Sequence, residues 1–313
     1  TYAPSRDEKF VYFPVTARAK KFKTINLPLA PRGEQPLSLA DALKKILTAR
    51  EMENLIKSFD VVGDIAIIEI PRALRKKEKT IANALLRVHK NLRVVCAKAG
   101  AMRGIFRTRK LRVLAGDKRT ETIYKESGCA FKLDVAKVYF SVRFSHERER
   151  VASLVKAGET VFVFFAGVGP FPIIIAKRQP RAKLYAIELN PRAYKYLEYN
   201  IALNRMSHQI IPVRGDVKKI VPKKFARAAD RILMPLPKGA GEFLGDAFDC
   251  ARRNCVIHFY SFSSEEKPFE DAVKKIQKIA QKKNRKVEFV NKKIIRPYAP
   301  HIAQVVLDFR ILN

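Results

Sequence analysis

The sequence predicts an α/β protein whose C-terminal half contains an open parallel sheet. An apolar run, Val161–Phe165, has the length of a buried strand and is followed by a glycine-rich turn, Ala166–Pro170. A second apolar run, Leu184–Ile187, follows the next helical segment and ends in Glu188. Two long strand-like segments near the C-terminus then predict a final antiparallel hairpin, which a plain dinucleotide-binding domain lacks.

The order of strand, glycine turn, helix, strand and carboxylate is typical of a Rossmann-like nucleoside pocket. Gly167 and Gly169 let the backbone approach a ligand where any Cβ would intrude, and Pro170 suits the first turn of the next helix. Glu188 lies 19 residues beyond Gly169, about the distance needed to reach two ribose hydroxyls. The glycines alone also fit an ordinary turn, but Glu188 favours the pocket because packing rarely needs a carboxylate at a strand tip.

Two further elements follow later strands. Asp216, after the third strand, can accept the exocyclic amine of adenine or cap the turn that follows it. Three such elements at consecutive strand ends favour S-adenosylmethionine over NAD as the cofactor. The turn Met234–Lys238 follows the fourth strand, where chemistry in such folds takes place. Its two prolines fit either a rigid loop that holds a target base or a stiff, thermostable turn.

We expect the chain to have three parts. Residues 1–52 form a small N-terminal module, with a strand at Phe10–Pro14 and a helix from Ser38, a suitable N-cap, to Arg50. Residues 58–135 form a basic α+β domain, and residues 136–313 form one α/β domain. The middle part is expected to have strands at 64–70, 92–97, 120–124 and 131–135, a short strand near Phe106, and a helix at 78–90. The last part is expected to have helices at 146–156, 170–178, 191–204, 240–252 and 266–282, and strands at 161–165, 183–187, 209–213, 230–234, 254–260, 287–295 and 302–310.

The charge balance indicates a polyanionic partner. The chain has 63 Lys and Arg against 30 Asp and Glu, a net charge of +33. Such a field attracts nucleic acid. A Lys-rich thermophile surface is the alternative, but thermophiles raise Glu along with Lys. A basic membrane-surface protein is a weaker alternative.

Composition also excludes several classes. No apolar stretch of 18 residues exists, so we expect no membrane span. No signal peptide is visible near the start, and the few scattered cysteines fit a reducing cytoplasm. The four cysteines form no C-x-x-C pair, so they are interpreted as small core residues and no metal site is expected. They are Cys96, Cys129, Cys250 and Cys255.

The segment Tyr139–Arg150 lies just before the predicted pocket. Taken alone, its charges fit the solvated face of a helix with Glu/Arg pairs. Five further segments are informative together: Val138–Arg143, Phe165–Phe171, Ala186–Pro191, Leu236–Lys238 and Tyr298–Pro300. In this order they resemble the archaeal and eukaryotic tRNA (guanine-37 N1)-methyltransferases.

The resemblance runs from about residue 58 to the end, and residues 1–52 also fit the small module that this family uses on the tRNA elbow. It implies a class I S-adenosylmethionine-dependent methyltransferase domain preceded by an RNA-binding domain. It also implies a cytoplasmic monomer that binds the anticodon stem-loop and the elbow of tRNA and turns guanine 37 outward.

The resemblance assigns a role to each matching residue. Glu147 is the general base that removes the N1 proton of guanine, and Arg107 faces the negative charge that develops on O6. Tyr139 and Arg143 hold the base and the anticodon backbone. The implied cofactor-binding residues are Phe165, Gly167, Val168, Gly169, Glu188, Leu189, Asp216, Val217 and Pro235. The substrate-binding residues also include Pro237 and Lys238.

The sequence departs from the family pattern at three positions. Val163 replaces the Asp before the glycine turn, which removes one polar anchor to the cofactor. Val142 replaces a Pro before Arg143. Pro235 replaces the Asn whose side chain hydrogen-bonds the target base.

These departures leave alternatives open. A subgroup of the family in the wyosine pathway methylates both guanine 37 and the tricyclic base made from it, and a loosened base pocket suits that range. Sister enzymes transfer an aminocarboxypropyl group instead, although Leu236–Lys238 argues for methylation. A non-catalytic RNA-binding protein on a methyltransferase scaffold is the alternative from another class. A small-molecule methyltransferase leaves the net charge unexplained.

Overall fold

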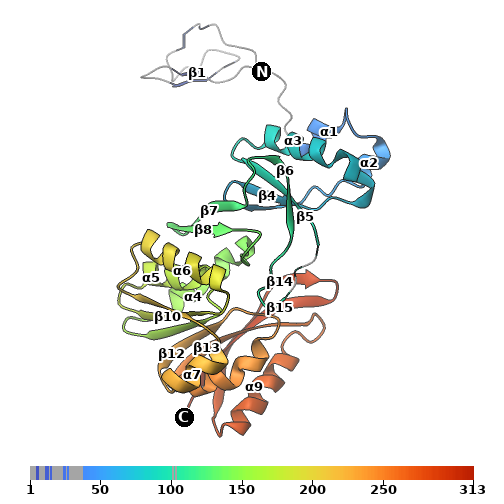
Figure 1. Ribbon diagram of the computed structural model, residues 1–313. Coiled ribbons are helices and arrows are strands. Elements are labelled where there is room, and N and C mark those ends of the chain that lie inside the picture. The colour runs from blue at the N-terminus through green and yellow to red at the C-terminus, as the bar shows by residue number, and fades with distance from the viewer. Residues whose placement is uncertain are drawn as a thin grey trace. The chain divides into compact units, whose positions relative to one another are not determined.

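The computed structural model describes residues 5–6, 11–13, 15, 24–25, 27, 38–100, 102 and 104–313 (Figure 1). The chain has two compact units: one comprises Thr1–Ser58 and Ile70–Asn91, and the other comprises Phe59–Glu69 and Leu92–Asn313. Each unit is described by itself. None of the described helices combines the length and the apolar composition of a membrane span.

The first unit contains short helices. In its N-terminal part β1 (Ser5–Arg6) pairs antiparallel with β2 (Val11–Tyr12). Strand β2 lies within the strand expected at Phe10–Pro14, whose two end residues are outside the described residues. The remaining elements are α1 (Leu39–Leu43), α2 (Ala49–Glu53), a 3-10 turn η1 (Arg72–Lys77) and α3 (Glu78–Val88). The helix expected over residues 78–90 is confirmed, and α1 packs against it.

The helix expected from Ser38 to Arg50 is wrong as one element. Ser38 does cap a helix, because its Oγ accepts from the Asp41 N–H at 3.1 Å. That helix ends at Leu43, and Thr48 begins a second one. Thr48 and Glu51 form a capping box, in which the Thr48 N–H donates to Glu51 at 2.8 Å, so two orphan N–H groups are satisfied at a new helix start.

The second unit begins with a four-stranded sheet in the order β3-β4-β5-β6 and a separate hairpin, β7–β8. Their bounds are β3 (Asp60–Val62), β4 (Ile65–Ile68), β5 (Val94–Lys98), β6 (Leu111–Gly116), β7 (Glu121–Glu126) and β8 (Cys129–Asp134). The strand expected near Phe106 is wrong. Gly104 and Arg107 both have positive φ there (68° and 51°), and the Arg107 N–H donates to Gly104 O at 3.1 Å, so the segment is a turn.

The predicted Rossmann-like sheet is confirmed. Among the described residues it has seven strands in the order β11-β10-β9-β12-β13-β15-β14, of which the first five are parallel and the last two form an antiparallel hairpin. The strands are β9 (Thr160–Phe164), β10 (Lys183–Glu188), β11 (Ile210–Arg214), β12 (Ala229–Met234), β13 (Ala251–Ser264), β14 (Val287–Ala299) and β15 (Ile302–Ile311). The helices are α4 (Ser145–Leu154), α5 (Pro170–Arg178), α6 (Pro191–Leu203), α7 (Val217–Lys224), α8 (Leu244–Cys250) and α9 (Glu270–Lys282), with 3-10 turns η2 (Val142–Phe144) and η3 (Ala240–Phe243).

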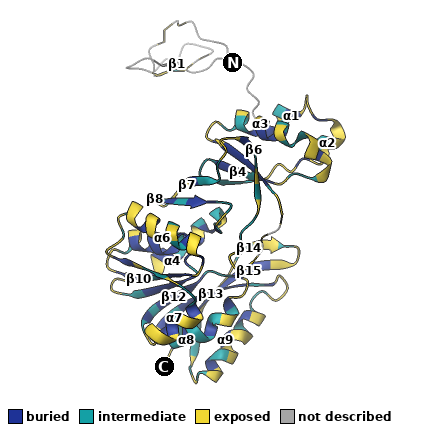
Figure 2. Cartoon of the chain, viewed as in Figure 1, coloured by how far each residue is buried: buried dark blue, intermediate teal, exposed yellow. Residues whose placement is uncertain are grey.

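Alternation along the strands divides the core into two layers. Phe162 and Phe164 pack with α7, α8 and α9, whereas Val161 and Val163 pack with α4, α5 and α6. The helices cover the two faces accordingly (Figure 1). Strands β9, β10, β12 and β15 are mostly buried, whereas β14 at the edge of the sheet and the outer helix faces are largely exposed or half-buried (Figure 2). All four cysteines are buried, as expected, and free.

Candidate functional site

The glycine turn after β9 has an unusual backbone. Phe165, Gly167 and Gly169 all have positive φ (59°, 59° and 94°). A Cβ on Gly169 would lie 2.7 Å from Leu197 Cδ1 and 3.0 Å from Ile173 Cδ1, so a larger residue would displace these side chains in addition to straining the left-handed backbone. A Cβ on Gly167 would meet nothing nearer than Tyr139 O at 4.0 Å, so the turn is open on that side. Left-handed backbone at a bulky residue such as Phe165 is rare, so the surrounding structure must hold this residue in a strained conformation.

Glu188 fixes this turn from the tip of β10. The Gly167 N–H donates to its Oε2 and the Asn190 N–H to its Oε1, each at 2.7 Å. The carboxyl is buried, and burial raises its pKa against the opposing effect of these backbone donors. Each carboxylate oxygen has a second lone pair, so Glu188 can still accept from two hydroxyl groups of a ligand.

Asn200 supports the same turn and was missed by the sequence analysis. Its side chain is fully buried on α6, and its Nδ2 donates to Val168 O at 2.9 Å and to Lys132 O at 3.0 Å. The glycine turn is therefore tied to the hairpin β7–β8 as well as to the sheet. An Asn inside a helix gives no sequence signal for this role.

A small cavity at the turn brings together several predicted residues. Those lining it are Tyr139, Phe165, Gly167, Val168, Pro235 and Pro237, which come from three separate segments. Its volume is about 60 Å³, below the several hundred that small-molecule sites occupy, so a nucleoside-sized ligand must widen it.

The other residues predicted to bind cofactor or substrate do not line this cavity, among them Gly169, Glu188, Leu189, Asp216, Val217 and Lys238. Asp216 caps α7 by accepting from the Lys218 N–H at 3.0 Å, which is its alternative role from the sequence. Val217 is buried behind it, Leu189 is 44% exposed after Glu188, and Lys238 is exposed after the proline turn.

Glu147 is buried on α4 and does not face open water. Its Oε1 accepts from the Tyr260 hydroxyl at 2.7 Å and from Arg150 Nη2 at 2.6 Å, and its Oε2 accepts from Arg150 Nε at 2.8 Å. It is not among the residues that line the small cavity, although Phe144 and Arg148 of the same segment are. The alternative of a solvated helix face therefore does not describe Glu147.

A buried ion network continues from Glu147 across the sheet. Arg150 Nη1 also donates to Asp308 at 2.7 Å, and Asp308 contacts His258 Nδ1 at 2.7 Å. His258 Nε2 in turn contacts Arg231, which pairs with Glu159 at 2.7 Å. Sequence reasoning missed this network because its members are spread over some 160 positions.

The pKa shifts of His258 and Asp308 indicate which members of the network are charged. Burial lowers the pKa of His258, and the guanidinium groups of Arg231 and Arg150 lower it further against the opposing effect of Asp308. Burial alone would raise the pKa of Asp308, but its contacts with His258 and Arg150 outweigh burial and hold it below the usual range. We infer a neutral His258 beside an ionised Asp308.

Arg107 and Tyr139 lie together. The Arg107 guanidinium is 4.7 Å from the centroid of the Tyr139 ring. Its Nη1 is buried and has no hydrogen-bond partner among the described residues. A buried donor without a partner is rare, and it fits a site where a ligand oxygen is expected.

Arg143 lies apart from this pair. It is exposed, and its Nη2 donates to Asp60 at 2.7 Å and its Nε at 3.0 Å. The structure thus brings Tyr139 and Arg107 together and directs Arg143 to β3.

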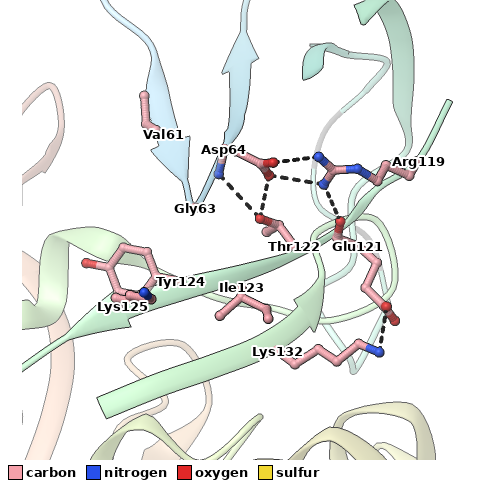
Figure 3. Close-up of a pocket in the computed structure, with 10 residues that line it drawn as sticks. All are labelled: Val61, Gly63, Asp64, Arg119, Glu121, Thr122, Ile123, Tyr124, Lys125 and Lys132. Carbon is pink, nitrogen blue, oxygen red and sulfur yellow. Dashed lines mark hydrogen bonds and ion pairs between the residues drawn. The ribbon is translucent and has the colours of Figure 1, made fainter. Parts of the chain in front are cut away.

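A much larger cavity, about 730 Å³, lies elsewhere, between the β3–β4 turn and the hairpin β7–β8 (Figure 3). Arg119 pairs with Asp64, and Thr122 donates to Asp64 at 2.7 Å. A Cβ on Gly63 would lie 2.2 Å from Thr122 Oγ1, so the turn and the hairpin are in close contact. None of the predicted site residues lines this cavity, so its size does not make it the catalytic site.

Comparison with known proteins identifies the family. A model of the TRM5/TYW2 methyltransferase domain matches residues 122–289, more than half of the chain, and a model of the TYW2 N-terminal domain matches residues 39–120. A curated relative, tRNA (guanine(37)-N(1))-methyltransferase Trm5b of Pyrococcus abyssi, is 42% identical over 311 residues, covering 99% of this chain and 91% of that protein. The chain belongs to the TRM5/TYW2 methyltransferase family.

Other members of the TRM5/TYW2 family show similar likeness. The tRNA (guanine(37)-N(1))/4-demethylwyosine(37)-methyltransferase Taw22 of Nanoarchaeum equitans is 35% identical, covering 71% of this chain and 89% of that protein. The crystal structure of Pyrococcus abyssi Trm5b has a TM-score of 0.80 at 41% identity, covering 100% of this chain and 92% of that chain.

Similar solved structures include complexes with tRNA and with AdoMet. The complex of aTrm5 with tRNALeu has a TM-score of 0.78 at 32% identity, covering 100% and 92% of the two chains. Methanocaldococcus jannaschii TYW2 in complex with AdoMet has a TM-score of 0.65 at 29% identity, covering 82% and 100%. The predicted family and fold are confirmed.

The structure shows what surrounds Val163 and Pro235, two of the residues at which the sequence was interpreted as departing from the family pattern. Val163 is fully buried in β9 and pairs with Ala186 of β10, so it adds to the core where a carboxylate would need a partner. Pro235 lies on the wall of the small cavity and offers it no hydrogen-bond donor.

Proposed function

We propose that this protein transfers a methyl group from S-adenosylmethionine to N1 of guanosine 37 in tRNA. The observation that carries the proposal is the meeting of three segments at one cavity: the glycine turn, the Tyr139 segment and the proline turn. They meet in a chain of this family with a net charge of +33. The net charge suits a tRNA partner, since phosphate contacts dominate affinity for nucleic acid.

The residues at the turn fit S-adenosylmethionine. Gly167 leaves open space beside the backbone, and the buried Glu188 carboxylate has lone pairs free for two ribose hydroxyls. In this proposal the residues that bind S-adenosylmethionine are Phe165, Gly167, Val168, Gly169, Glu188, Leu189, Asp216, Val217 and Pro235. The bound cofactor supplies an electrophilic methyl group.

Glu147 takes the N1 proton of guanine in this proposal. The proton must leave because protonated N1 is a poor nucleophile at neutral pH. Oε1 already accepts two hydrogen bonds, whereas Oε2 accepts one within the described residues, so Oε2 is the oxygen with room for a proton. Arg150 orients the carboxylate, because its Nε and Nη2 each donate to one carboxylate oxygen.

Arg107 stabilises the charge that moves to O6 as N1 is deprotonated. Its unpartnered Nη1 donor supports this role, and the Tyr139 ring orients its guanidinium. Because guanine 37 must leave its stack to reach the cavity, aromatic Tyr139 also suits contact with the outward-turned base. Arg143, Pro237 and Lys238 hold the surrounding nucleotide.

Three further expectations remain part of the proposal. Residues 1–52 contact the tRNA elbow, residues 58–135 grip phosphates as a separate domain, and residues 136–313 carry out catalysis. The enzyme works as a monomer in the cytoplasm.

The function is tested with unmodified tRNA, labelled S-adenosylmethionine and mapping of the methyl group by mass spectrometry. We expect 1-methylguanosine at position 37 and no label on a transcript with adenosine at that position. A methyl group at another nucleotide would contradict the site assignment, and calorimetry showing no cofactor binding at millimolar concentration would favour a non-catalytic RNA-binding protein.

A second activity is favoured by Pro235. Because this wall residue cannot donate a hydrogen bond, the cavity is less selective for the guanine edge, and Taw22 of Nanoarchaeum equitans is named for both guanine 37 and 4-demethylwyosine. We expect methylation of tRNA that carries the tricyclic base at a rate within about tenfold of that on guanine. A rate at background would restrict the enzyme to guanine.

A further inference from the structure

The Tyr298–Pro300 motif at the end of β14 does not belong to the cofactor turn, the small cavity or the buried ion network. Tyr298 packs its ring on Phe262 of β13, with centroids 4.0 Å apart and planes tilted by 33°. Gln304 of β15 pairs with both Phe262 and Arg296, so the Tyr298 ring reaches across the middle strand. Tyr298 is nevertheless 49% exposed. The ring has a second aromatic ring behind it and an open side.

This ring pair lies close to the proposed base. Tyr260, two residues before Phe262, points to the same face of the sheet and donates to Glu147 at 2.7 Å. Two residues along a strand span about 7 Å. The pair also lies at the carboxyl edge of the parallel strands, since Ser264 at the end of β13 pairs with Ile302 at the start of β15. The C-terminus, beyond the other end of β15, lies at the opposite edge (Figure 1).

The hairpin tip is held by backbone pairing and by contacts on both sides. Ala299 pairs with Ile302, which closes a two-residue turn at Pro300 and His301. His301 has a φ of 61°, and its carbonyl accepts from the Glu265 N–H at 3.1 Å. Arg296 Nε donates to Gln304 at 3.0 Å beside the ring. A ring held in this way loses little freedom when something stacks on it.

The chemistry of this surface fits an RNA base. The Arg296 guanidinium is 5.9 Å from the Tyr298 centroid, so a planar cation adjoins a supported aromatic ring in a strongly basic chain. Aromatic rings and guanidinium planes are what proteins use to stack unpaired bases. A methyltransferase that turns one base outward leaves its neighbour without a stacking partner.

We propose that Tyr298, supported by Phe262 and flanked by Arg296, stacks on the nucleobase adjacent to the one that is methylated. The inference rests on the proposed function, and it places position 36 or 38 of the anticodon loop on this ring. The platform replaces the stacking that the neighbour loses when guanine 37 turns outward.

The test compares Tyr298→Leu with Tyr298→Phe. Leu keeps apolar cover on Phe262 without a ring face, and Phe keeps the ring without the hydroxyl. We expect Leu to weaken tRNA binding roughly 5- to 100-fold while Phe stays near wild type. Calorimetry with S-adenosylmethionine and thermal unfolding should be unchanged in both variants, because the residue is half-exposed and outside the cofactor turn.

A fluorescent base locates the contact. With 2-aminopurine at position 36 or at position 38, wild-type enzyme should quench the probe at one position, and Tyr298→Leu should abolish that quenching. Wild-type tRNA affinity in Tyr298→Leu, or equal quenching in both proteins, would overturn the platform while leaving methylation of guanine 37 intact. If the wild type itself neither binds tRNA nor methylates it, both the platform and the proposed function fall.

Discussion

The glycine turn and the buried ion network hold the two carboxylates of the site in different ways. Glu188 is fixed by backbone N–H groups at most 21 residues away, and burial raises its pKa. Glu147 is fixed by the side chains of Tyr260 and Arg150, and Arg150 is itself held by Asp308, which lies 158 positions further along the chain. A ligand-holding carboxylate can be positioned locally, whereas the proposed base depends on the folding of the whole domain.

The largest expected effect comes from removing the proposed base. Glu147→Gln should lower the single-turnover rate by about 10²- to 10⁴-fold, since general-base catalysis typically contributes that much. Cofactor affinity, measured by calorimetry, should be unchanged. Glu149→Gln is the matched control, because Glu149 lies on the same helix in an exposed pair with Arg178. Equal rates in the two variants would remove Glu147 from the mechanism.

Breaking the network tests its structural part. Asp308→Ala leaves Arg150 and His258 without their shared carboxylate, so the free energy of unfolding should fall by about 3–5 kcal/mol. Denaturant unfolding measures it. The exposed pair of Glu288 and Arg310 on the same hairpin is the control, and Glu288→Ala should cost about 0–1 kcal/mol. Similar losses of unfolding free energy in Asp308→Ala and Glu288→Ala would show that the buried network stabilises the protein no more than an exposed ion pair does.

The two glycines of the turn should respond differently. Gly169→Ala combines a left-handed backbone with a clash at Leu197 and should cost about 2–4 kcal/mol of stability. Gly167→Ala has only the backbone cost, about 1–2 kcal/mol, because its Cβ enters open space. Its main effect should be on cofactor affinity. A stable Gly169→Ala protein with normal unfolding would show that the turn can relax.

The smallest effect is on pH dependence. The folded pKa of His258 is lowered, so below about pH 6.5 the unfolded chain takes up a proton that the folded protein does not, and stability falls as pH falls. The loss is at most about 1.4 kcal/mol per pH unit. Asp308, with its lowered pKa, adds a further loss below about pH 3.8, while Glu188, with a raised pKa, opposes it at acid pH.

Unfolding midpoints between pH 7 and pH 5 measure the His258 contribution. His258→Gln should flatten this dependence, and His146→Gln, at an exposed position, should not. An unchanged slope in His258→Gln would mean that other groups carry the proton uptake.

Elements with a local sequence signal are predicted correctly. The strand, turn and helix from Thr160 to Arg178 and the tip of β10 follow from the sequence because apolar length, glycine and proline each constrain a few neighbouring residues. Elements that lack such signals were not predicted. Helix α7 was missed because Pro222 and several lysines obscure its apolar face, and β3 because it has three residues.

The candidate site divides in the same way. Glu188 and the glycines followed from spacing, while the roles of Glu147 and Arg107 came from resemblance to a family. Tyr260, Asp308 and His258 gave no signal, because their partners lie 50 or more positions away. Only the folded sheet brings His258 of β13 opposite Asp308 of β15.

The central claim is that Glu188 holds the cofactor whereas Glu147 acts as the base. The most direct test is the single-turnover rate of methyl transfer to guanosine 37 in Glu188→Gln and in Glu147→Gln, measured at saturating tRNA and increasing S-adenosylmethionine. The account predicts that Glu188→Gln regains a near wild-type rate at high cofactor concentration, whereas Glu147→Gln stays slow at every concentration. Recovery of Glu147→Gln by added cofactor, or a rate defect in Glu188→Gln that no concentration relieves, would contradict it.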